Sequence, residues 1–221
     1  MFSSPIYGSY SIGKKTEAAG TVITKLIPPR ANAFTRLTWL EVLTGAMAHT
    51  MTIMRPLNKT TLSAVAAGGQ AVISLVADPG NYPTTIQTAD NVIAANDYVV
   101  VELPDVTYHV GLVSSVATLD ITLTANLPTG GAASGAKVWF FGIITDTNPN
   151  TAEAHAQYTL TANATNLFGN RAGESIVGFF ETIKGLTALS MTGKEEPLVV
   201  HIGNATNAST IEGGQAVYTS K

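Results

Sequence analysis

The sequence predicts an all-β protein, a β-sandwich (jelly-roll-like) with a second small β-barrel or sandwich unit inserted into it. Short segments rich in Val, Ile, Thr and aromatic residues recur along the chain between Gly, Pro, Asn and Asp, which is typical of strands and their turns. Apolar residues recur at helical spacing in 175–189, but Gly178 and Gly185 penalise a helix there. We interpret this segment as strands, with a helix as the alternative.

The first strands precede the predicted insertion. Residues 21–26 are rich in β-branched residues and end at a Pro-Pro pair, which stops a strand. Residues 36–42 alternate between polar and apolar side chains, which predicts Leu37 and Trp39 on one face of a strand. Residues 49–55 are predicted to return beside 36–42 as a hairpin with a longer connection.

The middle of the chain contains the predicted inserted unit. Residues 58–70 are small and polar, which predicts either one short helix or a linker into a strand at 71–76. Further strands with short turns follow in close succession. They are predicted at 97–103, 107–116, 119–124 and 137–144. This spacing is typical of a small barrel or sandwich.

The last part of the chain returns to β character. Strands are predicted at 157–161, 167–169, 186–191, 197–202 and 215–219. Glu195 and Glu196 fall in a predicted hairpin turn, where we expect a solvated pair. The string Gly-Gly-Gln-Ala-Val occurs at 68–72 and again at 213–217, and each copy predicts a Gly-Gly turn that leads into a strand.

The order of these elements predicts the domains. Residues 21–57 and 157–221 are expected to form the β-sandwich, because the first strands still need partners when the compact middle group begins. Residues 71–144 are expected to form the inserted small β domain. Two consecutive domains are the alternative.

Residues 1–20 are predicted to form an N-terminal arm. Ser and Gly residues make this segment flexible, yet apolar and aromatic side chains are interleaved with them, and a purely solvated tail has no use for those. Either the arm lies on a neighbouring subunit, or it is an edge strand folded back on its own domain. The side chains expected at a subunit or capsid interface are Phe2, Ile6, Tyr7, Tyr10 and Ile12.

The composition restricts the partners. Charged residues make up 12% of the 221 residues and the formal net charge is -3, so the chain lacks the excess of Lys and Arg that phosphate binding needs, and no nucleic-acid partner is expected. No apolar run approaches the roughly 18 residues of a membrane span, so no membrane partner is expected either. A fraction of charged residues this low favours a subunit of an assembly over a lone monomer. The alternative is that Thr, Ser and Asn supply enough polarity for the surface of a monomer.

No chemistry of catalysis or metal binding is evident. The sequence contains no cysteine, and its four histidines, His49, His109, His155 and His201, do not show the spacing of a zinc site. His109 and His201 lie in apolar strands and are predicted to be packed or rim histidines. Nucleophile elbows, phosphate-binding loops and dinucleotide fingerprints are missing as well. We therefore predict no catalytic residue, no cofactor and no metal, and a protein that is not an enzyme.

The chain resembles the accessory structural proteins of tailed bacteriophage virions, above all head decoration (cement) proteins. The resemblance is carried by the cysteine-free pattern rich in Thr, Ala and Gly, by the aromatic-dotted arm, and by a terminus such as HIGNATNASTIEGGQAVYTSK at 201–221. It implies a virion protein on the outer surface of the head, made in the host bacterial cytoplasm. It also implies that this protein clamps neighbouring subunits of the major capsid protein as a homotrimer. A phage tail, fibre or receptor-binding component and a carbohydrate-binding β-sandwich are the alternatives.

Overall fold

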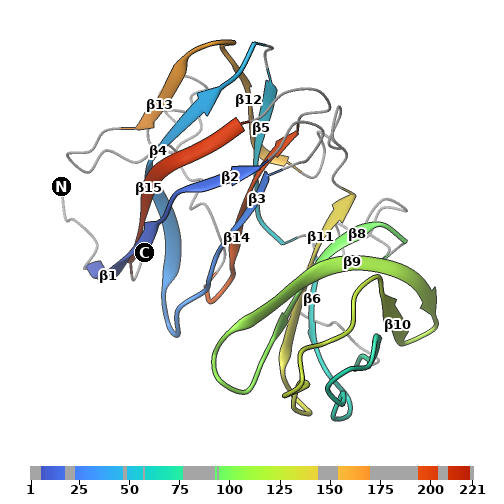
Figure 1. Ribbon diagram of the computed structural model, residues 1–221. Helices are drawn as coiled ribbons and strands as arrows, with labels where there is room; N and C mark the ends of the chain where they lie inside the picture. Colours follow the sequence, from blue (N-terminus) through green and yellow to red (C-terminus); the bar gives the residue numbers. More distant parts are fainter. Residues whose placement is uncertain are drawn as a thin grey trace. The chain divides into compact units, whose positions relative to one another are not determined.

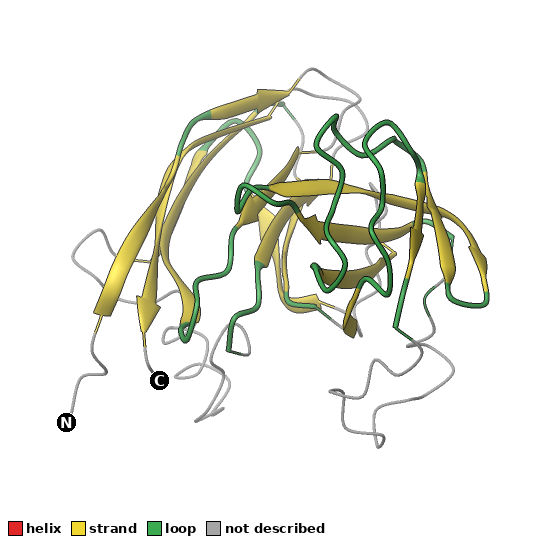
Figure 2. Cartoon of the chain, turned by 90° about the horizontal axis from the view of Figure 1, so that it is seen from below, coloured by secondary structure: helices red, strands yellow, loops and turns green. Residues whose placement is uncertain are grey.

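The computed structural model describes residues 6–17, 23–46, 49–56, 58–76, 93, 95–143, 154–169, 194–203 and 209–219. Every regular element in these ranges is a β-strand, which confirms the all-β prediction (Figure 2). No helix in the described part is long and apolar enough to cross a membrane. The chain divides into two compact units, which are described separately: Met1–Arg55 together with Thr145–Lys221, and Pro56–Ile144.

The first unit consists of two antiparallel sheets. The first sheet has the order β1-β15-β4-β13, and β2 also pairs β15. Its strands are β1 (Ile6–Ile12), β2 (Lys15–Glu17), β4 (Phe34–Thr44), β13 (Thr165–Gly169) and β15 (Ser209–Thr219). The second sheet has the order β12-β5-β14-β3. Its strands are β3 (Ile23–Ile27), β5 (His49–Met54), β12 (Ala154–Leu160) and β14 (Leu198–Gly203).

These pairings are those of one long antiparallel hairpin that is rolled into two sheets (Figure 1). From its ends inward, β1 pairs β15, β3 pairs β14, β4 pairs β13 and β5 pairs β12. Each sheet contains one further antiparallel pairing between the nested pairs: β15 also pairs β4, and β14 also pairs β5. This nesting is the topology of a jelly roll, so the predicted jelly-roll-like sandwich is confirmed. Residues 56–144 follow β5 and precede β12, at the tip of the long hairpin.

The core of the jelly roll lies between its two sheets. Both sheets contribute side chains that are at most 1% exposed. The first sheet supplies Ile12, Leu37, Leu40, Val42, Ile211 and Ala216, and the second supplies Ile27, Met51, Ile53, Leu160, Leu198, Val200 and Ile202. Burial of apolar area on this scale is the main favourable contribution to folding of the unit.

The expected hairpin between residues 36–42 and 49–55 is wrong. β4 lies in the first sheet beside β13 and β15, whereas β5 lies in the second sheet beside β12 and β14. An alternating pattern determines which side chains of a strand face a core, but the same pattern fits any partner strand. The partners of β4 and β5 come from the other end of the chain, so local sequence could not identify them.

A bulge in β4 changes the face of Leu37. Gln215 of β15 is opposite Trp39, but its neighbour Ala216 is opposite Leu37, so Thr38 is an extra residue in β4. Leu37 is therefore buried in the same core as Leu40, and not on the side of Trp39 as strict alternation predicts. The hydroxyl of Thr38 donates to the carbonyl oxygen of Gln215 at 2.7 Å.

The two Gly-Gly strings have different roles. Gly68 and Gly69 form a turn before the next strand, as predicted, with Gly69 at φ +77°. Gly213 and Gly214 lie inside β15, so the predicted turn at the second copy is wrong. A Cβ on Gly214 would lie 2.9 Å from Cδ1 of Leu40, and a Cβ on Gly213 would lie 3.3 Å from the ring of Trp39. Glycine is used there because neighbouring side chains occupy the space on both faces.

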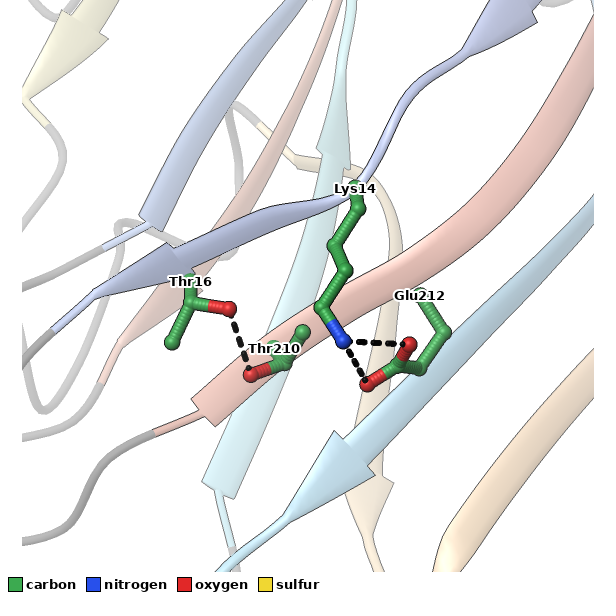
Figure 3. A network of polar contacts seen from close by, with 4 residues as sticks. All are labelled: Lys14, Thr16, Thr210 and Glu212. Carbon is green, nitrogen blue, oxygen red and sulfur yellow. Dashed lines mark hydrogen bonds and ion pairs between the residues drawn. The ribbon is translucent and has the colours of Figure 1, made fainter.

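Residues 6–17 form an edge strand on their own unit, the second of the two possibilities for the arm. β1 pairs the end of β15, and β2 pairs its beginning. At the break between them, Nζ of Lys14 donates to both carboxylate oxygens of Glu212 at 3.1 and 3.0 Å (Figure 3). The hydroxyls of Thr16 and Thr210 lie 3.0 Å apart. The ion pair is exposed, so it orients the strand more than it stabilises the fold.

The second unit is a six-stranded antiparallel sheet with the order β6-β11-β8-β9-β10-β7. Its strands are β6 (Asn58–Thr61), β7 (Val72–Ser74), β8 (Asp97–Glu102), β9 (Tyr108–Ala117), β10 (Asp120–Leu123) and β11 (Lys137–Ile143). The two edges meet at a bridge between Leu62 and Leu75, so the sheet closes into a barrel. Its interior is filled by apolar side chains that include Ile73, Val99, Val113, Ile121, Val138 and Phe140.

The barrel begins earlier in the chain than the prediction of residues 71–144. Residues 58–61 are the strand β6, paired with β11, and neither a helix nor a linker. The side chains at 59–61 are half-buried, and β-branched threonines suit such a strand. The predicted strands 97–103, 107–116, 119–124 and 137–144 agree with β8 to β11.

Candidate interaction surface

Three loops lie at one end of the barrel. β6 and β8 end there and β11 begins there, because β6 and β8 are both antiparallel to β11. The loops are 62–71 between β6 and β7, 103–107 between β8 and β9, and 124–136 between β10 and β11. We call them the loop end, which is the lower end of the barrel in Figure 1. The chain enters at β6 and leaves after β11 at the opposite end.

Loops 62–71 and 124–136 are fastened to each other by backbone hydrogen bonds. Ala66 and Ala132 exchange both N–H···O bonds, at 2.9 and 2.8 Å. The carbonyl oxygen of Leu127 accepts from Gly69 N at 3.0 Å, and Leu127 N donates to the carbonyl oxygen of Gln70 at 2.8 Å. The side chain of Leu127 is 2% exposed and extends the barrel core under the loops. These contacts hold the loop end in one conformation.

Two glycines permit this close approach. A Cβ on Gly68 would overlap the carbonyl oxygen of Thr129, and a Cβ on Gly131 would overlap that of Ala66. Gly131 also has φ +60°, a conformation that side chains with a Cβ adopt at a cost. The backbones of the two loops therefore touch where no side chain intervenes.

The third loop places a valine in a strained conformation. Val106 N donates to the carbonyl oxygen of Leu103 at 3.1 Å, and Leu103 N donates to that of Thr107 at 2.9 Å. The Asp105 carboxylate accepts from Thr107 N at 3.2 Å and from the Thr107 hydroxyl. This turn puts Val106 at φ +62°, the position that favours glycine in such hairpins. A left-handed backbone costs a residue with a Cβ about 1–2 kcal/mol.

The loop end is almost without charge, and it exposes two valines among small and uncharged polar residues. Val65 and Val106 are 73% and 71% exposed, the highest values among the exposed large hydrophobic side chains of the described residues. Asp105 is the only charged residue in the three loops, and its carboxylate is engaged by Thr107. Depletion of charge is a property of the centres of protein interfaces. The arrangement suits contact with another protein.

The structure places the predicted interface side chains of the arm in different surroundings. Ile12 is 1% exposed in the jelly-roll core, and Tyr10 packs against that core. Phe2 and the side chains of Ile6 and Tyr7 lie outside the described residues. The arm and the loop end belong to different units, and sequence reasoning missed the loop end. Its signal was present in the uncharged strings at 62–71 and 124–136.

The described residues contain no group of three or more His, Asp or Glu side chains that could hold a metal ion. His201 is 2% exposed in β14, with Nδ1 3.4 Å from the hydroxyl of Thr24. The expectation of a solvated pair at Glu195 and Glu196 is wrong for Glu196, which is 8% exposed. Glu195 accepts from the backbone of Asn32 at 2.8 Å. Both residues pack where the chain enters β14.

His109 faces the barrel interior from β9. It lies opposite Val101, whose side chain is in the core, and its ring covers Gly111. Its Nε2 is buried and finds no hydrogen-bond partner among the described residues. Burial lowers the pKa of His109, opposed by a backbone hydrogen bond with Ala125.

The lowered pKa of His109 predicts acid sensitivity of the barrel. The unfolded chain takes up a proton near pH 6.5, but the folded chain does so only at lower pH. The stability that neutral His109 contributes is therefore present above about pH 6.5 and is lost as the pH falls through its folded pKa. We expect the free energy of unfolding, measured in urea between about pH 7.5 and 5, to fall more steeply for the wild type than for His109→Gln. Parallel pH profiles would contradict this assignment.

Comparison with known proteins gives distant matches only. No protein-family model matches the chain, and no curated protein matches it. The VP16-VP17 complex, a complex of the two major capsid proteins of bacteriophage P23-77, aligns over 96% of this chain and 99% of the matched chain, with 9% identity and a TM-score of 0.22. VP17, a capsid protein of the same phage, aligns over 96% and 98%, with 10% identity and a TM-score of 0.21. These TM-scores are too low to support an argument about fold or function.

Proposed function

We propose that this protein is a virion structural protein that decorates and stabilises a bacteriophage capsid by clamping neighbouring subunits of the major capsid protein. It acts as a homotrimer on the outer surface of the head. The observation that carries the proposal is the loop end, a braced and nearly uncharged surface with exposed valines, on a barrel inserted at the tip of a jelly-roll hairpin. Jelly rolls are common in viral capsid proteins and also in lectins, so the surface and not the fold argues for assembly.

A clamp acts through the area that it buries. Apolar surface removed from water contributes about 25 cal/mol per Å², so ~1,000 Å² shared between two subunits is a large gross stabilisation before the costs of association. A subunit displaced by internal pressure would have to expose that area again. The protein needs no catalytic group for this role, only two rigid surfaces that reach different subunits.

The arm is the second proposed contact, and the structure changes how it must be tested. Deletion of residues 1–20 would remove β1 and β2 and with them Ile12 of the core, so a loss of attachment could reflect unfolding. Deletion of residues 1–5 leaves every described strand intact. We expect this shorter deletion to weaken attachment to capsids while the unfolding midpoint stays unchanged.

The proposal is tested by co-sedimentation. Purified protein is added to capsids of the encoding phage from which this protein is missing, and bound protein is measured against concentration. Saturable binding, together with a higher disruption temperature of the decorated capsids, is the expected result. Failure of the wild-type protein to bind would contradict a decoration role. Binding to tails or to glycans instead would favour the fibre or carbohydrate-binding alternatives.

A further inference from the structure

We propose that the loop end is the surface that faces the capsid, and that Val106 is its anchor, inserted into an uncharged apolar recess on a capsid lattice protein. This inference rests on the proposed function and names the contact surface that the function needs.

The conformation of Val106 indicates a partner outside the chain. Hydrogen bonds on both sides of the turn fix this residue at φ +62°, where glycine or asparagine is favoured and a β-branched residue is a rare outlier. Its side chain is 71% exposed, so packing within the chain does not offset the strain. Valine at this position is unfavourable for the isolated barrel. The contacts that offset this strain therefore come from a molecule outside the chain, as they do for strained residues at binding sites.

A second exposed valine lies at the same end of the barrel as Val106. Val65 is 73% exposed on loop 62–71, at the same end of the barrel. That loop is fastened to residues 124–136 through the Ala66–Ala132 pair. Both valines are thus carried on loops whose backbones are already fixed by hydrogen bonds. A surface fixed in advance loses little conformational entropy when it binds, which favours a small contact.

The low charge of the three loops restricts the chemistry of the partner. Asp105 is the only charged residue of the three loops, and Thr107 already donates to its carboxylate. A partner that buried its own charge against this surface would find no ion to pair with, which is costly. Phosphate-rich partners such as nucleic acid or lipid headgroups would find no Lys or Arg in the three loops, and Lys137 at the start of β11 is a single cation beside Glu102, whose carboxylate accepts from its backbone N at 3.2 Å. The complementary surface is therefore a neutral protein recess that fits a branched aliphatic side chain.

The test compares variants of the full-length protein in the capsid co-sedimentation assay. Val106→Gly removes the side chain and relieves the strain, and Val106→Asn keeps a side chain that tolerates the same φ. Val65→Thr replaces a methyl group by a hydroxyl at constant shape. Val116→Thr is the matched control, because Val116 is also a valine on the barrel surface, 39% exposed in β9 opposite Ile121 and outside the three loops. Thermal unfolding of each variant is measured in parallel.

We expect both Val106 variants to bind capsids at least tenfold more weakly, which corresponds to about 1.4 kcal/mol. Their unfolding midpoints should equal or exceed that of the wild type, because the strain is relieved. Val65→Thr should bind several-fold more weakly, and Val116→Thr should bind like the wild type. A variant that loses capsid binding while its unfolding midpoint stays the same or rises identifies Val106 as a binding anchor. A residue needed for the fold would lose both stability and binding.

Two results would overturn the inference. The first is wild-type binding by Val106→Gly. The second is a photo-reactive amino acid at position 106 that cross-links to a second copy of this chain, and not to a lattice protein, in decorated capsids. Failure of the wild-type protein itself to bind would instead refute the proposed function, so the two failures are distinguishable.

Discussion

Replacement of Gly131 by alanine should lower the free energy of unfolding of the barrel by about 2–4 kcal/mol. The new Cβ would overlap the backbone of Ala66, and the residue would have to keep φ +60°. The overlap is with backbone atoms, so no side-chain rotation can relieve it. The two fastened loops must separate, which also breaks the hydrogen bonds between Ala66 and Ala132. Denaturation in urea, followed by tryptophan fluorescence, measures the change.

Gly130 provides the matched control for this substitution. It precedes Gly131 in the same loop, and a Cβ built on it meets nothing within 4 Å. We expect Gly130→Ala to change the free energy of unfolding by less than about 0.5 kcal/mol, as surface substitutions do. Capsid binding should be lost with Gly131→Ala and kept with Gly130→Ala. Equal effects of the two substitutions would show that the loops are not fastened in the way described.

Ile12→Ala should destabilise the jelly roll by about 2–5 kcal/mol, the usual cost of truncating a buried isoleucine. Ile12 is 1% exposed and packs with residues of both sheets, so its removal leaves a cavity in the core of its own unit. The measurement is urea denaturation at several protein concentrations. Because the loss arises within one chain, it should not depend on concentration.

Ser11→Ala serves as the control for Ile12→Ala. Ser11 is the preceding residue of β1, its side chain is exposed, and its backbone pairs with Gln215 as in the wild type. We expect almost no change in stability. A destabilisation by Ile12→Ala that vanished on dilution would instead assign Ile12 to an interface between chains, as the composition of the arm first suggested.

The position of the barrel explains how the fold accommodates it. Ala154 of β12 lies opposite Met54 of β5, so the two ends of the insertion leave the jelly roll side by side. Residues between them can be added without disturbing the nested pairs of the long hairpin. Neighbouring chain ends are the condition under which domain insertion is tolerated.

Local sequence was sufficient for the all-β class, for the strands β8 to β11 and for the burial of His201. These features depend on side chains close together in the chain: β-branched runs, period-two alternation and turn residues. The same information was not sufficient for β4 and β5, which are consecutive in the chain but lie in different sheets. Nor did it reveal the bulge at Thr38 or the packing of Trp39 on Gly213.

The loop end shows most clearly which features follow from local sequence and which depend on the tertiary structure. The turn at 103–107 could be anticipated from Pro104 and Asp105, but the left-handed conformation of Val106 depends on hydrogen bonds formed only in the closed hairpin. Val65 and Val106 lie at the same end of the barrel because β6 and β8 both pair β11 and both end where β11 begins. Strand partners, and therefore loop neighbours, are chosen by burial against residues distant in the chain. Residue types and local turns follow from the sequence alone, whereas the tertiary structure decided which loops share one end of the barrel.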